Sequence, residues 1–298
     1  MLLRQLEYLT VLARERHFSR AALACHVSQP SLSAAIRKLE DELGVPLVQR
    51  GHRYDDLTPE GRALLSWAQQ AVATVEGLAA EASRLRGDLS GTLRMGVIPT
   101  ALPAISLITG PLLDRHHGVR LEVRSHSSIE IGQLLHNHDI DVGVTYIDNE
   151  PLGAVHATPL YEERYVYLTA SDATPGPSIG WRQLRDEPLC LLTPDMQNRR
   201  IVGAAFASAG VRVAPRVEVN SITAMLAFAR RGRSCVMAQT WLWLHGLPAG
   251  MRALVLTDPE PVHTIGLVTS AAGPDQPLVA ALIDTLRGND IGAQLRES

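Results

Sequence analysis

The chain has 298 residues, of which 46% are hydrophobic and 20% are charged. This length and composition predict two or three globular domains with a sizeable core. The formal net charge of −3 excludes a chain-wide basic field of the kind that coats nucleic acid, so any contact with DNA must be local. No signal-peptide pattern begins the chain, and no apolar run reaches the roughly 18 residues of a membrane helix. We therefore expect a cytoplasmic protein without a membrane partner.

Residues 18–46 predict a helix-turn-helix, in which two short helices joined by a tight turn are followed by a longer helix. In the second helix, which has Pro30 in its first turn, Leu32, Ile36, Leu39 and Leu43 recur at spacings of four, three and four. Residues at this spacing lie on one stripe of a helix, so we expect all four to pack inward.

The opposite face of this helix is polar and basic. Small residues with hydroxyl and guanidinium donors suit a helix that enters the DNA major groove, which is about 12 Å wide. Ser28 is the predicted N-cap, which leaves N–H groups at the helix start for a DNA phosphate. The alternative is a surface helix with one basic pair. The candidate DNA-contacting residues here are Ser28, Gln29, Pro30, Ser31, Ser33, Arg37 and Lys38.

A basic loop or hairpin is predicted over residues 48–58. Arg50 and Arg53 flank Gly51, and Thr58-Pro59 is typical of an N-cap followed by proline in the first helical position. This arrangement is typical of the wing of a winged helix-turn-helix. It adds Arg50 and Arg53 to the candidate DNA contacts.

Residues 1–65 closely resemble the start of LysR-type transcriptional regulators. The resemblance rests on Ser28-Gln29-Pro30, Ser33, Leu39-Glu40, Leu43-Gly44 and Leu57-Thr58-Pro59-Glu60-Gly61. It implies a winged helix-turn-helix over residues 1–58, double-stranded promoter DNA as partner, assembly into a homodimer or homotetramer, and RNA polymerase as a possible partner. Ala34 and Asp55-Asp56 depart from the family pattern and suggest fewer phosphate contacts than usual.

A long linker helix is predicted over residues 59–87. Apolar side chains recur there at alternating spacings of four and three, which is a heptad seam, and a helix of roughly 40 Å can pair with its copy. We therefore predict dimerisation through this helix, and the alternative is a helix packed on its own domain. Residues 86–91 contain two glycines and predict a hinge. The seam residues are Leu64, Ala68, Ala71, Val75, Leu78, Ala82 and Leu85, and the first five are the predicted dimer contacts.

After the hinge, strands and helices alternate, which indicates an α/β fold with a parallel sheet. The order of elements resembles the periplasmic-binding-protein-like effector domain of LysR-type regulators. This implies an effector domain over residues 88–298, with subdomain I at about 92–160 and 266–298 and subdomain II at about 161–265. The predicted strands cover residues 92–98, 119–125, 141–147, 163–169, 190–193, 213–219, 234–239 and 264–270.

Polar residues follow several of these strands, where ligands bind in open α/β sheets. Hydroxyls, amides and free N–H groups at helix starts suit a small carboxylate or other anion, although each residue alone also fits a simple N-cap. The stretch 16–33 resembles regulators encoded beside formate dehydrogenase genes, which implies formate or a similarly small acid as inducer. The candidate effector-binding residues are Thr100, Ser127, Ser128, Thr145, Thr193, Gln197 and Asn220.

Two rival classes are a cytoplasmic two-lobed α/β enzyme and a solute-binding protein with an appended helical domain. The histidines show no HExxH spacing, and no GxSxG, Walker A or GxGxxG segment occurs, so we expect no catalysis and no cofactor. Cys25, Cys190 and Cys235 lack metal-ligand spacing. Because Cys190 and Cys235 lie 45 positions apart, we expect buried small side chains and no redox switch.

Overall fold

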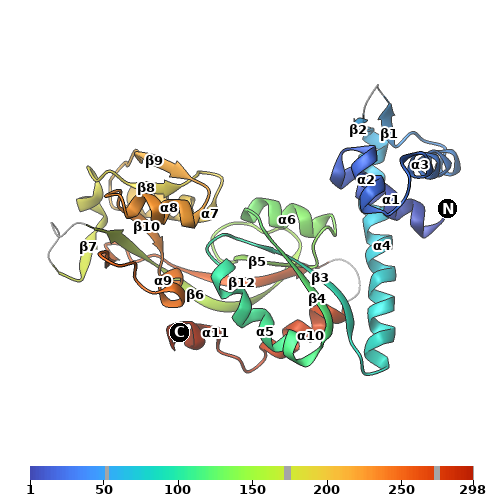
Figure 1. The fold of residues 1–298 in the computed structure, drawn as a ribbon. Coiled ribbons are helices and arrows are strands. Elements are labelled where there is room, and N and C mark those ends of the chain that lie inside the picture. Colours follow the sequence, from blue (N-terminus) through green and yellow to red (C-terminus); the bar gives the residue numbers. More distant parts are fainter. Residues whose placement is uncertain (51–53, 171–175, 272–275, 298) are drawn as a thin grey trace.

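An N-terminal helical unit, a long helix and a large α/β unit follow one another along the chain (Figure 1). The computed structural model describes residues 1–50, 54–170, 176–271 and 276–297. Arg53, one of the predicted DNA contacts, lies outside the described residues. No helix in the described ranges is long and apolar enough to cross a membrane.

The N-terminal unit is built around a small apolar core. Leu9, Leu12, Leu32, Ile36 and Leu39 are each at most 1% exposed and join its three helices. Its elements are α1 (Leu3–Glu15), α2 (Phe18–Ala24), α3 (Gln29–Leu43), β1 (Val48–Arg50) and β2 (Tyr54–Leu57). The antiparallel pair of β1 and β2 is the predicted wing hairpin.

Two details of the predicted helix-turn-helix are wrong. Residues 18–46 form two helices, α2 and α3, and the longer of them is the predicted recognition helix itself. Leu43 is 38% exposed, because α3 ends there and Gly44 turns the chain away in the left-handed conformation with φ 72°. The inward stripe therefore stops at Leu39.

Glu40 anchors the wing to the end of α3. Its buried carboxylate accepts hydrogen bonds from the backbone N–H groups of Leu47, at 2.8 Å, and Val48, at 3.2 Å. Both N–H groups lie where the chain enters β1. A carboxylate satisfies these two buried donors at once, which fixes the wing relative to the recognition helix.

Glu40→Ala should lower the free energy of unfolding by about 2–4 kcal/mol, because two buried N–H groups lose a charged acceptor. Urea unfolding of the full chain measures this. Glu40→Gln keeps one acceptor oxygen and should lose less. Glu42→Ala, which removes an exposed partner of the N-terminal amine, is the matched control and should stay within about 0.5 kcal/mol of wild type. Equal stability of the two alanine variants would contradict this role of Glu40.

The linker helix α4 (Pro59–Leu85) begins as predicted, with Thr58 Oγ1 accepting from the Gly61 N–H at 2.8 Å. A Cβ at residue 61 would lie 2.1 Å from the Leu47 carbonyl oxygen, so only glycine allows the helix to pass the wing this closely. The N-terminal half of α4 packs on the helix-turn-helix core through Ala68, which is 4% exposed.

The α/β unit has one continuous path of strands in the order β4-β3-β5-β12-β6-β10-β8-β9, and β11 and β7 extend it from β6. Lobe I, defined as β4, β3, β5, β12 and the first part of β6, adjoins α4, whereas lobe II, the remaining strands with their helices, extends away from it (Figure 1). The strands of lobe I are β3 (Ser90–Val97), β4 (Gly118–Ser125), β5 (Val142–Tyr146), β6 (Val155–Thr169) and β12 (Val262–Ser270). Those of lobe II are β7 (Ser178–Gly180), β8 (Cys190–Leu192), β9 (Val217–Val219), β10 (Cys235–Ala238) and β11 (Arg252–Thr257).

Helices cover the faces of this sheet. Lobe I carries η1 (Leu102–Ala104), α5 (Ile105–Arg115), α6 (Ser128–His136), α10 (Pro277–Leu286) and α11 (Ile291–Glu297). Lobe II carries η2 (Trp181–Leu184), α7 (Gln197–Ser208), α8 (Ile222–Ala229) and α9 (Gln239–His245).

β6 is longer than the predicted strand 163–169 and belongs to both lobes. Its first part pairs with β12 and its last part with β10 and β11. The predicted subdomain boundary at residues 160 and 161 therefore falls inside a strand. Pro159 and a register shift between Ile265 and Gly266 break the alternation there, which explains why the sequence pattern begins only later.

Candidate functional site

The outward face of α3 presents the predicted DNA contacts. Ser28, Gln29, Pro30, Ser31, Arg37 and Lys38 are exposed, and Ser33 is half-buried. Among the residues that the structure describes, no hydrogen bond or ion pair holds the Arg37 guanidinium. A free guanidinium on an exposed helix face is available to a guanine edge or a phosphate.

Some hydrogen-bonding groups at the start of α3 already have partners within the chain. Ser28 Oγ accepts from the Ser31 N–H at 3.3 Å, and Ser19 Oγ donates to Gln29 Oε1 at 2.8 Å. The first bond is the predicted Ser28 cap, and the second holds the Gln29 side chain without using a backbone N–H group. Arg50 lies on β1, and its side chain is outside the description.

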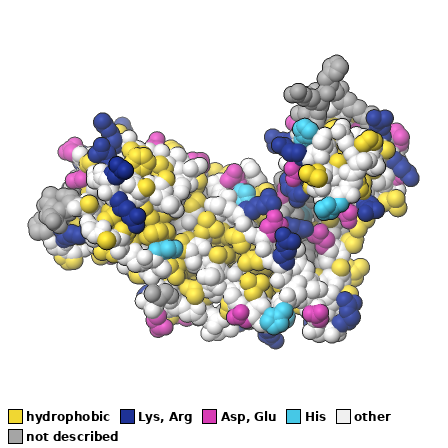
Figure 2. Space-filling view, in the orientation of Figure 1, with side chains coloured by type: hydrophobic (Ala, Val, Ile, Leu, Met, Phe, Trp, Pro, Cys, Tyr) yellow, Lys and Arg dark blue, Asp and Glu magenta, His cyan; other side chains and the backbone are white. Residues whose placement is uncertain are grey.

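On the face shown in Figure 2, Lys and Arg side chains do not gather in one patch. Dark blue side chains lie on the N-terminal unit, beside its junction with the α/β unit, at the lower right and on lobe II, with magenta acidic side chains among them. This agrees with a net charge of −3 and with a local DNA contact by the N-terminal unit.

The predicted seam of α4 divides into two parts. Leu64, Ala68 and Ala71 are buried or half-buried on the helix-turn-helix core, whereas Val75 is 42% and Leu78 68% exposed. Two other large apolar side chains on α4 are also exposed. Trp67, which the sequence prediction did not include, is 70% exposed, and Leu85 is 74% exposed. Intervals of eleven and seven residues place Trp67, Leu78 and Leu85 on one stripe, which is the exposed apolar surface of α4.

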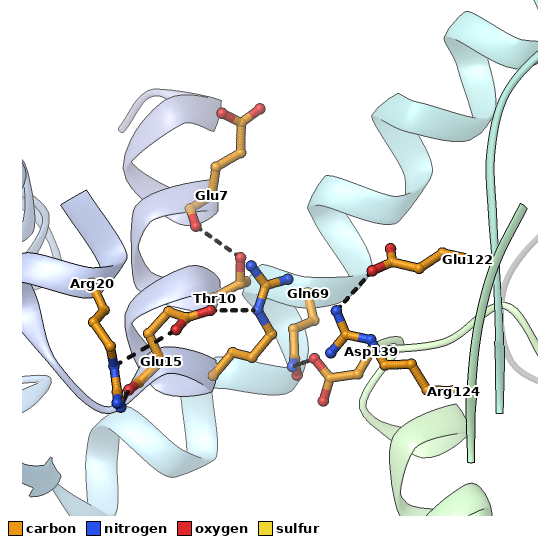
Figure 3. A network of polar contacts seen from close by, with 9 residues as sticks. Glu7, Thr10, Glu15, Arg20, Gln69, Glu122, Arg124 and Asp139 are labelled. Carbon is orange, nitrogen blue, oxygen red and sulfur yellow. Dashed lines mark hydrogen bonds and ion pairs between the residues drawn. The ribbon is translucent and has the colours of Figure 1, made fainter. Parts of the chain in front are cut away.

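The other face of α4 contacts lobe I of its own chain. Gln69 Nε2 donates to Asp139 Oδ1 at 3.0 Å (Figure 3), and the Arg94 guanidinium on β3 binds the Glu76 carboxylate at 2.9 and 3.1 Å. Burial raises the pKa of the Asp139 carboxyl, and the Gln69 amide partly offsets this. Lobe I and the linker helix are therefore joined by direct polar contacts.

Between α1 and lobe I lies a cavity of about 320 Å³. Arg14 of α1 and Arg124 of β4 line it from opposite sides. Each is close to an acidic partner, with Arg14 near Glu15 and Arg124 bonded to Glu122 at 2.7 Å (Figure 3). These two arginines are therefore each beside a carboxylate.

The candidate effector cleft is a buried polar cluster where the lobes meet. Asn198 Nδ2 of α7 donates to Tyr146 Oη at 3.2 Å, and Tyr165 Oη donates to the same oxygen at 3.1 Å. Tyr146 in turn donates to Glu163 Oε1, and Thr100 Oγ1 lies 3.5 Å from Tyr146 Oη. Thr100, Tyr146 and Glu163 are at most 2% exposed. Lobe I supplies Thr100 and Tyr146, lobe II supplies Asn198, and the shared strand β6 supplies the other two.

Two further contacts hold the lobes together beside this cluster. The Arg200 guanidinium of α7 binds the Glu150 carboxylate at 2.6 and 2.7 Å and donates to Ser128 Oγ at 3.3 Å. Gln197 Nε2 donates to Asn149 Oδ1, which follows β5. These hydrogen bonds and this ion pair thus join the two lobes beside the cluster.

The predicted effector residues have different surroundings. Thr100 lies in the cluster, and Gln197 and Ser128 lie in the contacts between the lobes. Ser127 is engaged in a capping box with Glu130 at the start of α6. Asn220 is exposed. Thr145 Oγ1, Thr193 Oγ1 and Gln197 Oε1 are buried without a hydrogen-bond partner in the described structure.

Glu163 and Tyr165 were missed by sequence reasoning. Tyr161, Glu163 and Tyr165 share the inward parity of β6, and a carboxylate among inward aromatic side chains is the signal that marks the position. Complete burial raises the pKa of the Glu163 carboxyl to about 7, although Tyr146 and Tyr165 hydrogen bonds favour the ionised form. The same burial, together with Glu163, raises the pKa of the Tyr146 hydroxyl well above its usual value.

The cysteines lie closer together than their separation in sequence suggested. Cys190 of β8 and Cys235 of β10 are directly opposite each other on neighbouring parallel strands. Their separation along the chain was therefore the wrong basis for expecting them to be apart in space. Both are fully buried, as expected, and burial raises the pKa of the Cys190 thiol to about 11 and that of Cys235 further still. In the described part of the chain, no group of three or more His, Cys, Asp or Glu side chains is placed to hold a metal ion.

A winged helix-turn-helix that is joined through a long helix to a two-lobed α/β domain defines a DNA-binding transcription regulator with an effector domain. Residues 3–62 match the bacterial regulatory helix-turn-helix protein family of LysR type, and residues 86–290 match the LysR substrate binding domain. The chain belongs to the LysR family of transcription regulators. This family assignment favours a regulator over the enzyme and the solute-binding protein that were considered as alternatives.

Known relatives span the whole chain. A hydrogen peroxide-inducible genes activator of Pectobacterium carotovorum is 32% identical over 96% of both chains. The transcriptional dual regulator OxyR of Escherichia coli is 32% identical over 96% of this chain and 95% of its own. A full-length cysteine-to-aspartate variant of OxyR from Pseudomonas aeruginosa has a TM-score of 0.77 and 26% identity, covering 98% of this chain and 97% of its own. CbnR in complex with its target DNA shares the fold, with a TM-score of 0.67 and 20% identity over 97% of this chain and 99% of its own.

Proposed function

We propose that this LysR-family regulator binds promoter DNA through α3 and the wing as a homodimer or homotetramer, and that a small carboxylate or other anion at the lobe junction controls it. Its place of action is the cytoplasm, where promoter DNA is bound and RNA polymerase is available as a partner. The observation that carries the effector proposal is the buried cluster of Thr100, Tyr146 and Asn198, which joins residues of both lobes.

The start of α7 supports an anionic effector. Its N-cap, Met196, has no side-chain acceptor, so the first N–H groups of the helix keep the positive end of the dipole uncapped. α6 differs, because Ser127 and Glu130 occupy its N-terminus. The buried hydroxyl of Thr193, which has no hydrogen-bond partner within the described structure, lies at the same end of α7 and can donate a hydrogen bond to an anionic ligand.

A ligand at this junction affects DNA binding only if it binds one arrangement of the lobes better than the other. Lobe I contacts α4 through the Gln69–Asp139 and Arg94–Glu76 pairs. α4 in turn packs on the core of the DNA-binding unit. This contiguous route links the effector cleft to α3.

Thr100→Val keeps the side-chain shape and removes the hydroxyl that faces Tyr146, so it should reduce effector affinity about 5- to 10-fold, as expected for one hydrogen bond. Calorimetry with formate, acetate and succinate measures this, and gel shift should show unchanged basal operator binding. Thr285→Val removes a hydroxyl that bonds within α10 and is the matched control. The assignment fails if none of the acids produces heat, or if Thr100→Val binds them as wild type does.

The names of the relatives raise peroxide as a second candidate signal, and the cysteines of this chain argue against it. The thiolate is the reactive form, and burial raises the pKa of all three thiols, of which Cys25 is half-buried in the DNA-binding unit. We expect stoichiometric peroxide to leave the three native thiols reduced by mass spectrometry and operator affinity unchanged. The protein unfolded in guanidinium is the positive control. Rapid formation of a Cys190–Cys235 disulfide in the native protein would overturn this expectation.

A further inference from the structure

The effector proposal does not explain why the Glu163 carboxyl is buried without a charged partner. It is 0% exposed, and its Oε1 atom accepts from the Tyr146 hydroxyl. Its Oε2 atom is buried and has no hydrogen-bond partner within the described structure. A buried carboxylate normally has an Arg, a Lys or several N–H donors around it, and here it has tyrosine hydroxyls.

Among the described residues, the neighbouring elements supply no cation that bonds to Glu163. From β5 comes Tyr146, and Asp148 follows this strand; from β12 comes His263, which is opposite Glu163 in register and whose imidazole lies 3.1 Å from Asp148. From β6 itself come Tyr161 and Tyr165. α7 contributes the Asn198 amide to the cluster. α9 has the buried hydroxyl of Thr240, and α11 buries Ile291 and Leu295 while Arg296 and Glu297 are exposed.

A small anion that contacts Thr100 and Tyr146 would lie one side chain away from Glu163, because the Tyr146 hydroxyl touches both residues. Two negative charges in a buried site do not both remain ionised, and the usual outcome is that the pair shares one proton. The nearby Glu163 carboxyl therefore requires one proton to be bound along with an anionic ligand. Hydroxyls and helix dipoles alone would not impose this requirement.

We propose that the effector cleft binds its small acid together with one proton, which is held between the ligand and the Glu163 carboxyl. The ligand class is thus a weak monocarboxylic acid taken up in net neutral form, and Glu163 discriminates against anions that keep their charge. This inference rests on the proposed function, because it concerns the same cleft.

The pH dependence of effector affinity follows from the protonation state of Glu163 in the ligand-free protein. Burial raises the pKa of Glu163 to about 7, so below this pH the carboxyl already carries its proton and an anion binds without proton uptake. Above pH 7 the proton must come from solvent, so affinity falls by up to about tenfold per pH unit. Raising the pH therefore weakens effector binding.

The test is calorimetry of the full-length protein with formate, acetate and succinate from pH 6 to 8.5, in pairs of buffers with different ionisation enthalpies. Wild type should take up about one proton per bound monocarboxylate at pH 8 and almost none at pH 6. Glu163→Gln keeps the shape and an acceptor for Tyr146, and its affinity should be independent of pH and near the wild-type value at pH 6. Succinate, which keeps a second charge, should bind much more weakly than acetate.

A matched control assigns the proton to one side chain. His263 is opposite Glu163 in register, so His263→Gln tests the other nearby ionisable side chain. It should retain the wild-type pH slope. A slope that disappears in His263→Gln and persists in Glu163→Gln would overturn the proposal.

Two other outcomes separate this inference from the proposed function. Acid binding without proton uptake, and with equal affinity at pH 6 and pH 8.5, would refute the proton link and leave the effector cleft intact. Absence of binding by all three acids at every pH would refute the small-acid effector itself and the inference with it. Infrared spectroscopy of the ligand-free protein adds a second readout, a protonated carboxyl band that disappears above pH 7 and is absent from Glu163→Gln.

Discussion

Leu78→Glu is expected to weaken self-association of this regulator by at least about 30-fold. Leu78 is 68% exposed on the apolar stripe of α4, and a dimer through this stripe would bury two glutamates without partners, each costing about 1–3 kcal/mol. Sedimentation equilibrium measures the effect. Operator affinity should fall in parallel, because two recognition helices must reach half-sites on one side of the duplex.

Leu247→Glu provides the control for this variant. Leu247 is 50% exposed and lies in lobe II, so the substitution adds the same charge away from α4. It should leave the association constant unchanged. If Leu78→Glu assembled as wild type does, the stripe of Trp67, Leu78 and Leu85 would not be the contact between copies.

Arg37→Ala should reduce operator affinity by at least about 30-fold at fixed salt while leaving the fold intact. One guanidinium contact with a guanine edge is worth about 1–3 kcal/mol, and a dimer contains two such contacts. Gel shift at constant ionic strength is the measurement, because salt alone changes affinity strongly. Arg37 is exposed and is not held by another side chain in the described structure, so little stability is at risk.

Two variants sharpen this experiment. Lys38→Ala should weaken specific and non-specific binding to a similar extent if Lys38 contacts a phosphate. Arg212→Ala removes an exposed arginine of the effector domain and should have no effect on operator affinity. If Arg37→Ala behaved as Arg212→Ala does, α3 would have to enter the groove with another face.

The elements that depend on local pattern were predictable from the sequence. The inward stripe of α3 through Leu39, the Thr58 cap of α4 and the alternation of strands and helices all follow from periodicity and capping, which act over a few residues. The family resemblance supplied the two-lobed fold of the effector domain. The resemblance also placed the DNA-binding unit at the correct end of the chain.

The parts that depend on distant pairing were not predictable in this way. The contact between Cys190 and Cys235 depends on strand order, which no local spacing encodes. The role of Glu163 depends on Tyr146, which lies on another strand. The division of the α4 seam depends on which side of the helix the N-terminal core and lobe I occupy. Long-range packing decides such features, so composition and period alone miss them.

The position of β12 in the sheet has a consequence for the order of events during synthesis. β12 (Val262–Ser270) is the last of the described strands along the chain, yet it lies between β5 and β6 in the finished sheet. The core of the DNA-binding unit is complete by Val72, so this unit folds while the sheet of the effector domain still lacks its central strand. A nascent chain therefore completes the core of its N-terminal unit before the sheet of the effector domain is complete, and β5 and β6 keep facing edges unpaired until β12 follows.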